Sequence, residues 1–176
     1  DGTKVKAGDA LIALASSGPH SNGFSLIRKI LEVSKADLQQ TVGDKSLADA
    51  LLEPTRIYVK PVLAAVEAAD VKAISHITGG GFYENIPRMM REGLTARVEK
   101  ASVPVPPIFS LLQKTGNIPE RDMYNTFNMG VGLCMAAGQF VGARLGARVV
   151  IRQGSQLIRP LVVLVSLLMS AKLLWS

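Results

Sequence analysis

Short apolar runs, separated by polar loops that contain glycine, recur along the first part of the chain. Asp9–Ala15 is an apolar run bounded by turn residues, which is typical of a buried strand. A polar loop follows over residues 16–23, and apolar residues then recur at helical spacing, which predicts a helix with one buried face. These apolar residues are Phe24, Ile27, Ile30 and Leu31.

The same order of strand, loop and helix is repeated later in the chain. Val71–Ile77 alternates apolar and polar residues as a strand does, and it runs directly into Thr78–Gly81, which contains three glycines. A short helix is expected over Tyr83–Met90. The repeated pattern predicts two loops of related design.

The remaining segments complete a domain in which helices and strands are interspersed. Residues 35–45 predict a surface loop, and Pro104–Pro107 predicts a rigid connector. Strands separated by helices of this length favour an α/β or α+β domain with helices covering the sheet. Further helices are expected over Ser46–Leu52 (ending before Pro54), Tyr58–Ala69, Ile108–Lys114 and Pro119–Tyr124, and further strands over Leu94–Val98 and, centrally, Asn128–Ala136.

The pattern changes after residue 137. Residues 160–171 carry no charge, but this run of 12 residues is shorter than the roughly 20 apolar residues that cross a bilayer. The sequence therefore divides into a domain over residues 1–137 and an unrelated apolar, arginine-bearing helical tail over residues 138–176. Glycines recur at every fourth position where the tail begins, as in closely packed membrane helices: Gly138, Gly142 and Gly146.

Charge and composition narrow the class of protein. The net charge is +6, but 15 of the 20 basic residues and all 14 acidic residues lie within residues 1–122, which leaves that part nearly neutral. A nucleic-acid partner is therefore not expected, because phosphate affinity needs several basic groups on one surface. The single cysteine, Cys134, excludes an internal disulfide, and no stretch resembles a secretory leader, so we expect a reducing, cytoplasmic compartment.

The loop over residues 16–23 is the first candidate site. Its glycines permit close approach of the backbone, and the helix that follows offers unpaired N–H groups that favour a phosphate or carboxylate. His20 could also change protonation near neutral pH. The alternative interpretation is that Ser21 or Asn22 simply caps the helix and that His20 is an exposed loop residue. The candidate binding residues are Ser17, Gly18, His20, Ser21, Asn22 and Gly23.

The second candidate site is the glycine run that follows His76. Three consecutive glycines cost conformational entropy, so a plain connector rarely uses them, and close approach to a ligand would explain their presence. A tight packing corner would explain them equally well, and His76 would then be an ordinary residue at a strand end. The candidate binding residues here are Thr78, Gly79, Gly80 and Gly81.

Several kinds of site are not indicated. Neither loop matches the phosphate loop of nucleoside triphosphatases or the dinucleotide fingerprint. No metal site is expected, because His20, His76 and Cys134 lie far apart in the sequence. A serine nucleophile elbow is also missing, so covalent catalysis has no candidate residue.

Four segments, taken in order, resemble the C-terminal domain of the phosphoribosylformylglycinamidine cyclo-ligases, also called aminoimidazole ribonucleotide synthetases. Together they cover residues 1 to about 136 in that family's order and spacing. The segments are S-S-G-P-H-S-N-G-F-S-L-I-R-K at Ser16–Lys29, L-L-E-P-T-R-I-Y-V-K at Leu51–Lys60, H-I-T-G-G-G-F-Y-E-N-I-P-R at His76–Arg88 and M-Y-N-T-F-N-M-G-V-G at Met123–Gly132.

The resemblance implies a mixed sheet covered by helices and an enzyme of purine biosynthesis that uses ATP to close formylglycinamidine ribonucleotide to aminoimidazole ribonucleotide. Family members are homodimers with two domains per subunit, and Mg²⁺ and ATP are bound mainly by the N-terminal domain. This chain would be a fragment that lacks that domain, that is truncated at the end of its own domain near residue 137, and that is inactive alone. The two loops would border the cleft where nucleotide and substrate meet, with His20 as the catalytic residue. The segment Glu53–Arg56 would support the scaffold or line the cleft edge.

The tail resembles something different. Residues 138–176 are similar to the C-terminal end of sulfite-exporter-type membrane permeases, including the L-I-R-P-L run at Leu157–Leu161. One alternative interpretation is therefore a membrane-associated protein that is anchored by this tail, with membrane contact possible only there. Another is a different member of the same ATP-using superfamily, such as a relative of selenophosphate synthetase or thiamine-monophosphate kinase.

Overall fold

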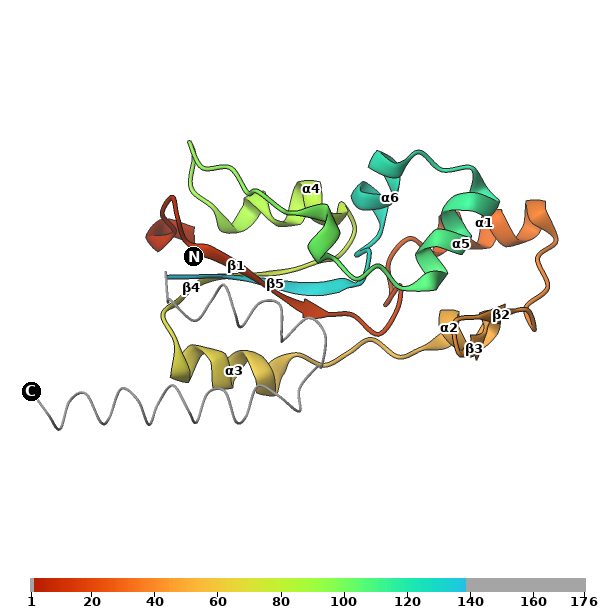
Figure 1. Ribbon diagram of the computed structural model, residues 1–176, viewed down its shortest axis with the longest axis horizontal. Helices are drawn as coiled ribbons and strands as arrows, with labels where there is room; N and C mark the ends of the chain where they lie inside the picture. The colour runs from red at the N-terminus through yellow and green to blue at the C-terminus, as the bar shows by residue number, and fades with distance from the viewer. Residues whose placement is uncertain (1, 139–176) are drawn as a thin grey trace, which may run out of the picture.

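A three-stranded antiparallel sheet forms the centre of the fold (Figure 1). The computed structural model describes residues 2–138. The strands are β1 (Ala10–Ala15), β4 (Val71–His76) and β5 (Val131–Ala137), in the spatial order β1-β5-β4. Every residue of β5 is buried, so the prediction that this segment is the central strand is confirmed. The register places Cys134 opposite both Ala13 and Ser75.

Helices cover both faces of this sheet, which confirms the α+β class. Helix α3 (Val59–Ala68) lies against one face and α4 (Gly81–Asn85) against the other (Figure 1). The side chains between α3 and the sheet are Tyr58, Leu14, Leu133 and Met135, joined by Val62 and Ala65. The side chains on the opposite face are Ile77, Ile86, Met89, Val131 and Cys134, joined by Phe82.

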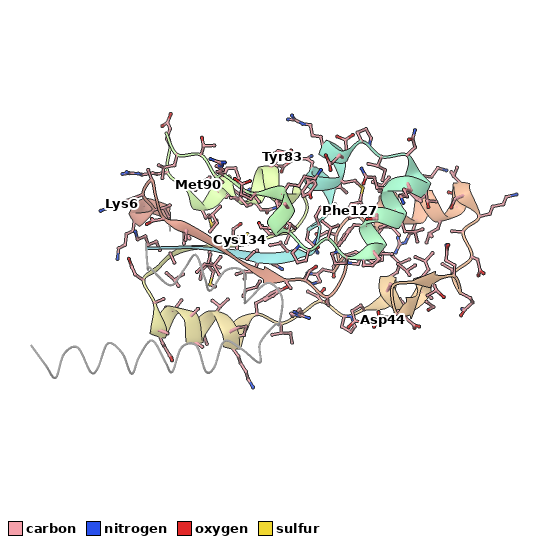
Figure 2. The ribbon with its side chains drawn as sticks, viewed as in Figure 1. Lys6, Asp44, Tyr83, Met90, Phe127 and Cys134 are labelled. Atoms are coloured by element: carbon pink, nitrogen blue, oxygen red, sulfur yellow. The ribbon has the colours of Figure 1, made fainter. Side chains whose placement is uncertain are left out.

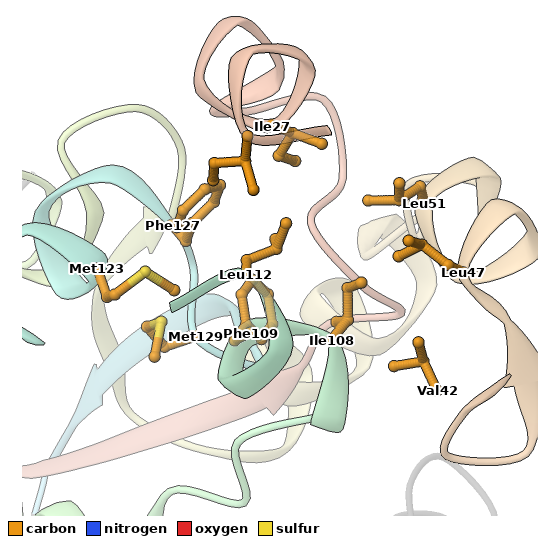
Figure 3. Close-up of a cluster of buried hydrophobic side chains, with 11 residues drawn as sticks. Ile27, Val42, Leu47, Leu51, Ile108, Phe109, Leu112, Met123, Phe127 and Met129 are labelled. Atoms are coloured by element: carbon orange, nitrogen blue, oxygen red, sulfur yellow. The ribbon is translucent and has the colours of Figure 1, made fainter. Parts of the chain in front are cut away.

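A second group of helices packs beyond the end of the sheet around its own core. It consists of α1 (Phe24–Ser34), α2 (Leu47–Leu52), α5 (Pro107–Gly116) and α6 (Glu120–Thr126). Figure 3 shows their apolar side chains converging from all four helices. Ile27 and Ile30 face this core, as the helical spacing predicts.

Local sequence explains where these helices begin and end. Ser46 caps α2, because its hydroxyl oxygen accepts a hydrogen bond from the Asp49 backbone N–H at 3.1 Å. Pro107 occupies the first turn of α5, where a missing N–H costs nothing, and Asn117 ends that helix in the left-handed conformation.

Three segments differ from the prediction. The expected surface loop over residues 35–45 contains most of a small hairpin, β2 (Thr41–Val42) and β3 (Lys45–Ser46), because Val42 inserts into the helical core. No strand forms over 94–98, where partly buried apolar residues contact the core without pairing to the sheet. Helix α4 ends at Asn85, and a short 3-10 helix, Pro87–Met89, follows because proline cannot continue the hydrogen-bond ladder.

The tail beyond Gly138 lies outside the described part of the chain. The predicted helical character of residues 138–176, their membrane contact and their role as an anchor concern residues beyond 138. Within residues 2–138, no helix is both long enough and apolar enough to span a bilayer.

Candidate functional site

The two glycine-bearing loops lie side by side at one edge of the central sheet. Strands β1 and β4 both run antiparallel to β5, so their C-terminal ends lie at the same edge, on either side of the start of β5. The loop after β1 leads into α1, and the loop after β4 leads into α4. Asn22 Oδ1 accepts a hydrogen bond from the Gly79 backbone N–H at 3.1 Å and joins the two loops. The fold therefore brings the two predicted sites together into one.

His20 is the most unusual residue of this site. Its side chain is only 5% exposed, so the interpretation of an exposed loop residue is wrong. Its backbone has a φ of 59°, in the left-handed region that costs a non-glycine residue about 1–2 kcal/mol. The ring Nε2 accepts a hydrogen bond from the Ser17 backbone N–H at 3.2 Å, whereas the buried Nδ1 has no partner among the described residues. Strain and unpaired buried polar atoms cluster at functional sites in proteins, which makes His20 the leading candidate of this site.

Two other rings surround His20. Tyr58, just before α3, lies with its ring centroid 6.1 Å from that of His20 and 6.1 Å from that of His76 at the end of β4, and the two histidine rings are 6.5 Å apart. The Tyr58 hydroxyl donates to the Ala15 carbonyl oxygen at 2.9 Å. Gly132 of β5 gives these rings room, because a Cβ there would lie 1.9 Å from Tyr58 Oη and 2.7 Å from His20 Cε1.

The electrostatics keep His20 and Tyr58 neutral near pH 7. Burial, with smaller contributions from His76 and Arg56, lowers the pKa of His20 from 6.5 to about 4. The expectation that His20 titrates near neutral pH is therefore wrong. Burial also raises the pKa of Tyr58 to about 12, a shift that the Arg56 charge partly opposes. The charge of Arg56 thus acts on both rings.

The segment after α2 runs along the first loop. Ser17 Oγ donates to the Pro54 carbonyl oxygen at 2.7 Å, and the hydroxyls of Ser21 and Thr55 lie 3.3 Å apart. Arg56 Nη1 donates at 3.2 Å to the same Ala15 carbonyl oxygen that accepts from Tyr58. These contacts hold an exposed guanidinium group beside the loop.

Asn128 holds the first loop through hydrogen bonds to Ser16 and Gly18. It was not predicted as a site residue. It is fully buried, its Nδ2 donates to the Gly18 carbonyl oxygen at 2.9 Å, and its Oδ1 accepts from Ser16 Oγ at 3.0 Å and from the Gly130 N–H at 2.9 Å. The only signal in the sequence is an asparagine two positions before a glycine, which favours a turn. The turn formed there delays β5 to Val131, later than predicted.

Helix capping does not explain the polar residues of the first loop. The residue at the N-cap of α1 is Gly23, and no side chain caps the helix, so the capping interpretation of Ser21 and Asn22 is wrong. Gly23 has a φ of 74°, and a Cβ there would lie 2.3 Å from the ring of Phe127. The side chains of Ser21 and Asn22 instead face Thr55 and Gly79.

Asn85 shapes the second loop. It is 2% exposed, and its Nδ2 donates to three backbone carbonyl oxygens of the loop at 2.8–3.2 Å. Its Oδ1 accepts from Thr78 Oγ1 at 3.3 Å and from Arg88 Nη1 at 3.2 Å. The three carbonyl oxygens belong to Thr78, Gly79 and Gly81.

The three consecutive glycines have different explanations. Gly81 is a packing position, because a Cβ there would lie 1.9 Å from the Tyr124 carbonyl oxygen. Gly80 adopts a φ of 91° at the N-cap of α4, which few other residues tolerate. Gly79 has no heavy atom within 4 Å of a Cβ position and is exposed. Packing therefore accounts for Gly81, and Gly79 is left as the position where a ligand could approach.

Other reactive groups lie elsewhere or are inert. Cys134 lies on β5 (Figure 2), and it belongs to the apolar cluster on the face of the sheet that α4 covers. Burial there raises the pKa of its thiol to about 12. Within the described range, no three histidine, cysteine or acidic side chains are gathered as metal ligands would be. A depression lined by Lys45, Asp49, Leu52, Glu53 and Pro54 lies beside the first loop, which it meets at Pro54.

Comparison with protein families matches most of the chain to one domain type. The family described as AIR synthase related protein, C-terminal domain, matches residues 6–148. The matched range contains the whole central sheet and both loops of the candidate site. It also extends past residue 137, where the sequence pattern predicts the end of the domain.

Proposed function

This chain belongs to the AIR synthase related proteins, whose C-terminal domain it carries, and from this membership we propose that it takes part in the ATP-dependent ring closure of formylglycinamidine ribonucleotide to aminoimidazole ribonucleotide. The observation that most supports the proposal is the joining of the two loops around His20. The buried Nδ1 without a partner suits a ligand that offers it a polar atom, and Gly79, which is joined to the same loop through Asn22, has open space for a ligand.

In this proposal the described residues bind and orient the ribonucleotide. Arg56 places a guanidinium group beside the first loop, and its charge acts on both His20 and Tyr58. This positive charge would attract an anionic group of a ligand to the first loop. Gly79 allows the substrate to approach the backbone of the second loop. His20 and Tyr58 are both buried and remain neutral at pH 7, so they add no charge to the site.

ATP would supply the phosphoryl group that activates the formyl oxygen for ring closure. The described residues fit one anionic group of a ligand but do not offer the phosphate loop of other nucleotide-binding proteins. The described residues also gather no set of ligands that would hold Mg²⁺. We therefore propose that binding of ATP and Mg²⁺ depends mainly on a further domain, and that the active form is a homodimer, as the family resemblance implies.

The proposal is tested by isothermal titration of the full chain with formylglycinamidine ribonucleotide and, separately, with ATP. We expect saturable binding of the ribonucleotide that weakens about tenfold or more in Arg56→Gln, because a charged hydrogen bond contributes about 1.5–3 kcal/mol. Arg28→Gln, an exposed arginine on α1, serves as the matched control and leaves binding unchanged. A folded chain that does not bind the ribonucleotide, or that loses binding equally in both variants, contradicts the proposal.

A further inference from the structure

The hydrogen bond at His20 Nε2 determines which nitrogen of the ring carries a proton. The Ser17 backbone N–H can only donate, so at 3.2 Å from Nε2 it requires a lone pair on that nitrogen. The Ser17 side chain bonds to the Pro54 carbonyl oxygen and helps to hold the backbone in this position. A neutral imidazole has one N–H, and with Nε2 as the acceptor that N–H must be at Nδ1.

The N–H at Nδ1 has no acceptor among the described residues, although His20 is only 5% exposed to solvent. A buried donor without a partner costs about 1–3 kcal/mol, so a fold that retains one holds it for an acceptor that arrives later. The left-handed backbone of His20 adds to this cost. Gly132 is also needed, because a Cβ at that position of β5 would lie 2.7 Å from Cε1 of the ring.

We infer that His20 is locked as the neutral Nδ1–H tautomer and acts as a permanent hydrogen-bond donor to an acceptor oxygen of the bound ligand, and not as a proton shuttle. The ligand class is one that presents a carbonyl, hydroxyl or phosphate oxygen to this corner of the site. The identity of that ligand as formylglycinamidine ribonucleotide rests on the proposed function, whereas the tautomer rests on geometry alone.

The groups around the His20 ring favour its neutral form, in which Nδ1–H acts as a hydrogen-bond donor. His76 from β4 and Arg56 from the segment before α3 both disfavour a charge on His20. The Tyr58 hydroxyl already donates its hydrogen bond to the Ala15 carbonyl oxygen. No carboxylate in the described part of the chain contributes to the pKa of His20, so the ring lacks the acidic partner that orients a histidine acting as a general base.

Nitrogen NMR of the full chain tests the tautomer directly. The chain contains only two histidines, so ¹⁵N-histidine labelling gives two rings, and His76→Gln assigns them. We expect His20 to show a protonated Nδ1 and a bare Nε2, with no titration as the pH falls through its ordinary value of 6.5. A protonated Nε2, or titration of His20 near that value, overturns the inference whether or not any ligand binds.

Substitution tests the donor role. Asparagine and aspartate both tolerate the left-handed backbone, and their side-chain heavy atoms reach the position of Nδ1, but only asparagine keeps a donor there. We expect His20→Asn to retain ribonucleotide affinity within about threefold, and His20→Asp and His20→Ala to lose about tenfold or more. Circular dichroism and urea unfolding confirm that each variant is folded.

The outcomes separate this inference from the proposed function. If the ribonucleotide binds but leaves the Nδ1 proton resonance unmoved, and all three variants bind equally, the donor role is wrong and the proposed function stands. If the full chain binds neither the ribonucleotide nor inorganic phosphate, the proposed function is wrong and the donor role falls with it, and the nitrogen shifts still decide the tautomer. Movement of the Nδ1 proton with either ligand, together with retention in His20→Asn alone, supports the inference.

Discussion

Asn22 Oδ1 accepts the backbone N–H of Gly79 at 3.1 Å, although the two residues are 57 positions apart in the sequence. This hydrogen bond joins the loop after β1 to the loop after β4 across the start of β5. Because Gly79 is exposed, its N–H could bond to water equally well, so the contact adds more to the geometry of the site than to the stability of the fold.

Asn22→Ala is expected to separate these two effects. The free energy of unfolding should fall by about 1 kcal/mol or less, because water replaces the lost acceptor. Ribonucleotide affinity should fall more, by about tenfold, because the second loop is no longer held against the first. Urea unfolding and isothermal titration measure the two quantities. Ser25→Ala, an exposed position in the first turn of α1, is the matched control and should change neither.

Alanine substitutions at Gly79 and at Gly81 should differ strongly in their effect on the free energy of unfolding. Gly81→Ala meets the Tyr124 carbonyl oxygen and a φ of 54°, so we expect a loss of about 3 kcal/mol or more. Gly79→Ala meets nothing within 4 Å, so stability should stay within about 0.5 kcal/mol. If a ligand approaches Gly79, this mild variant still weakens binding. Unchanged affinity in stable Gly79→Ala would show that no ligand uses this position.

The sequence predicts the two loops well, because each one follows a strand and precedes a helix, a local pattern. Their meeting depends on the antiparallel order β1-β5-β4, which places the ends of β1 and β4 at one edge and which no local pattern indicates. Asn128 was missed for the same reason, since its bonds to Ser16 and Gly18 span 112 and 110 positions.

Two further misses arise from tertiary contacts. Tyr58 was predicted only as the start of a helix, although its ring lies 6.1 Å from each of the two histidine rings. The segment 94–98 has an alternating pattern that favours a strand, but it does not pair with the sheet, and its apolar residues pack against the core instead. Local sequence patterns therefore predict where helices and strands can form. Tertiary packing decides which of these segments become strands and which side chains come together in the site.

Stability should depend on pH through His20. The folded protein lowers the pKa of this residue from 6.5 to about 4, so between these values the unfolded chain binds a proton that the folded chain does not. The stabilisation is therefore complete above pH 6.5 and is lost as the pH falls toward about 4. Its upper limit is about 3 kcal/mol, at about 1.4 kcal/mol for each pKa unit.

Urea unfolding of the full chain and of His20→Asn across this range tests the prediction, since the variant should lose the slope. Asp9 acts in a lower range: burial alone would raise its pKa, but hydrogen bonds from Lys72 and the Lys6 backbone lower it overall. The contribution of Asp9 is present above its ordinary value of 3.8 and lost below it. A slope between pH 6.5 and about 4 that persists in His20→Asn would assign the effect to other groups.

Gly132 and Tyr58 should be energetically coupled through the space that they share. Gly132→Ala places a methyl group 1.9 Å from Tyr58 Oη and 2.7 Å from His20 Cε1, so we expect a loss of about 1–3 kcal/mol and a displaced His20 ring. Tyr58→Phe alone loses one hydrogen bond, about 0.5–1.5 kcal/mol, while the Ala15 carbonyl oxygen keeps its bond from Arg56.

The double variant should be more stable than the sum of the two losses predicts, because removing the hydroxyl oxygen relieves the shorter contact. We expect a coupling energy of about 0.5–3 kcal/mol in a double-mutant cycle followed by urea unfolding. The contact with His20 Cε1 remains in the double variant, so ribonucleotide affinity should stay low even as stability recovers. Additive losses would show that the sheet moves at β5 to accept the methyl group, and that Gly132 is not what positions His20.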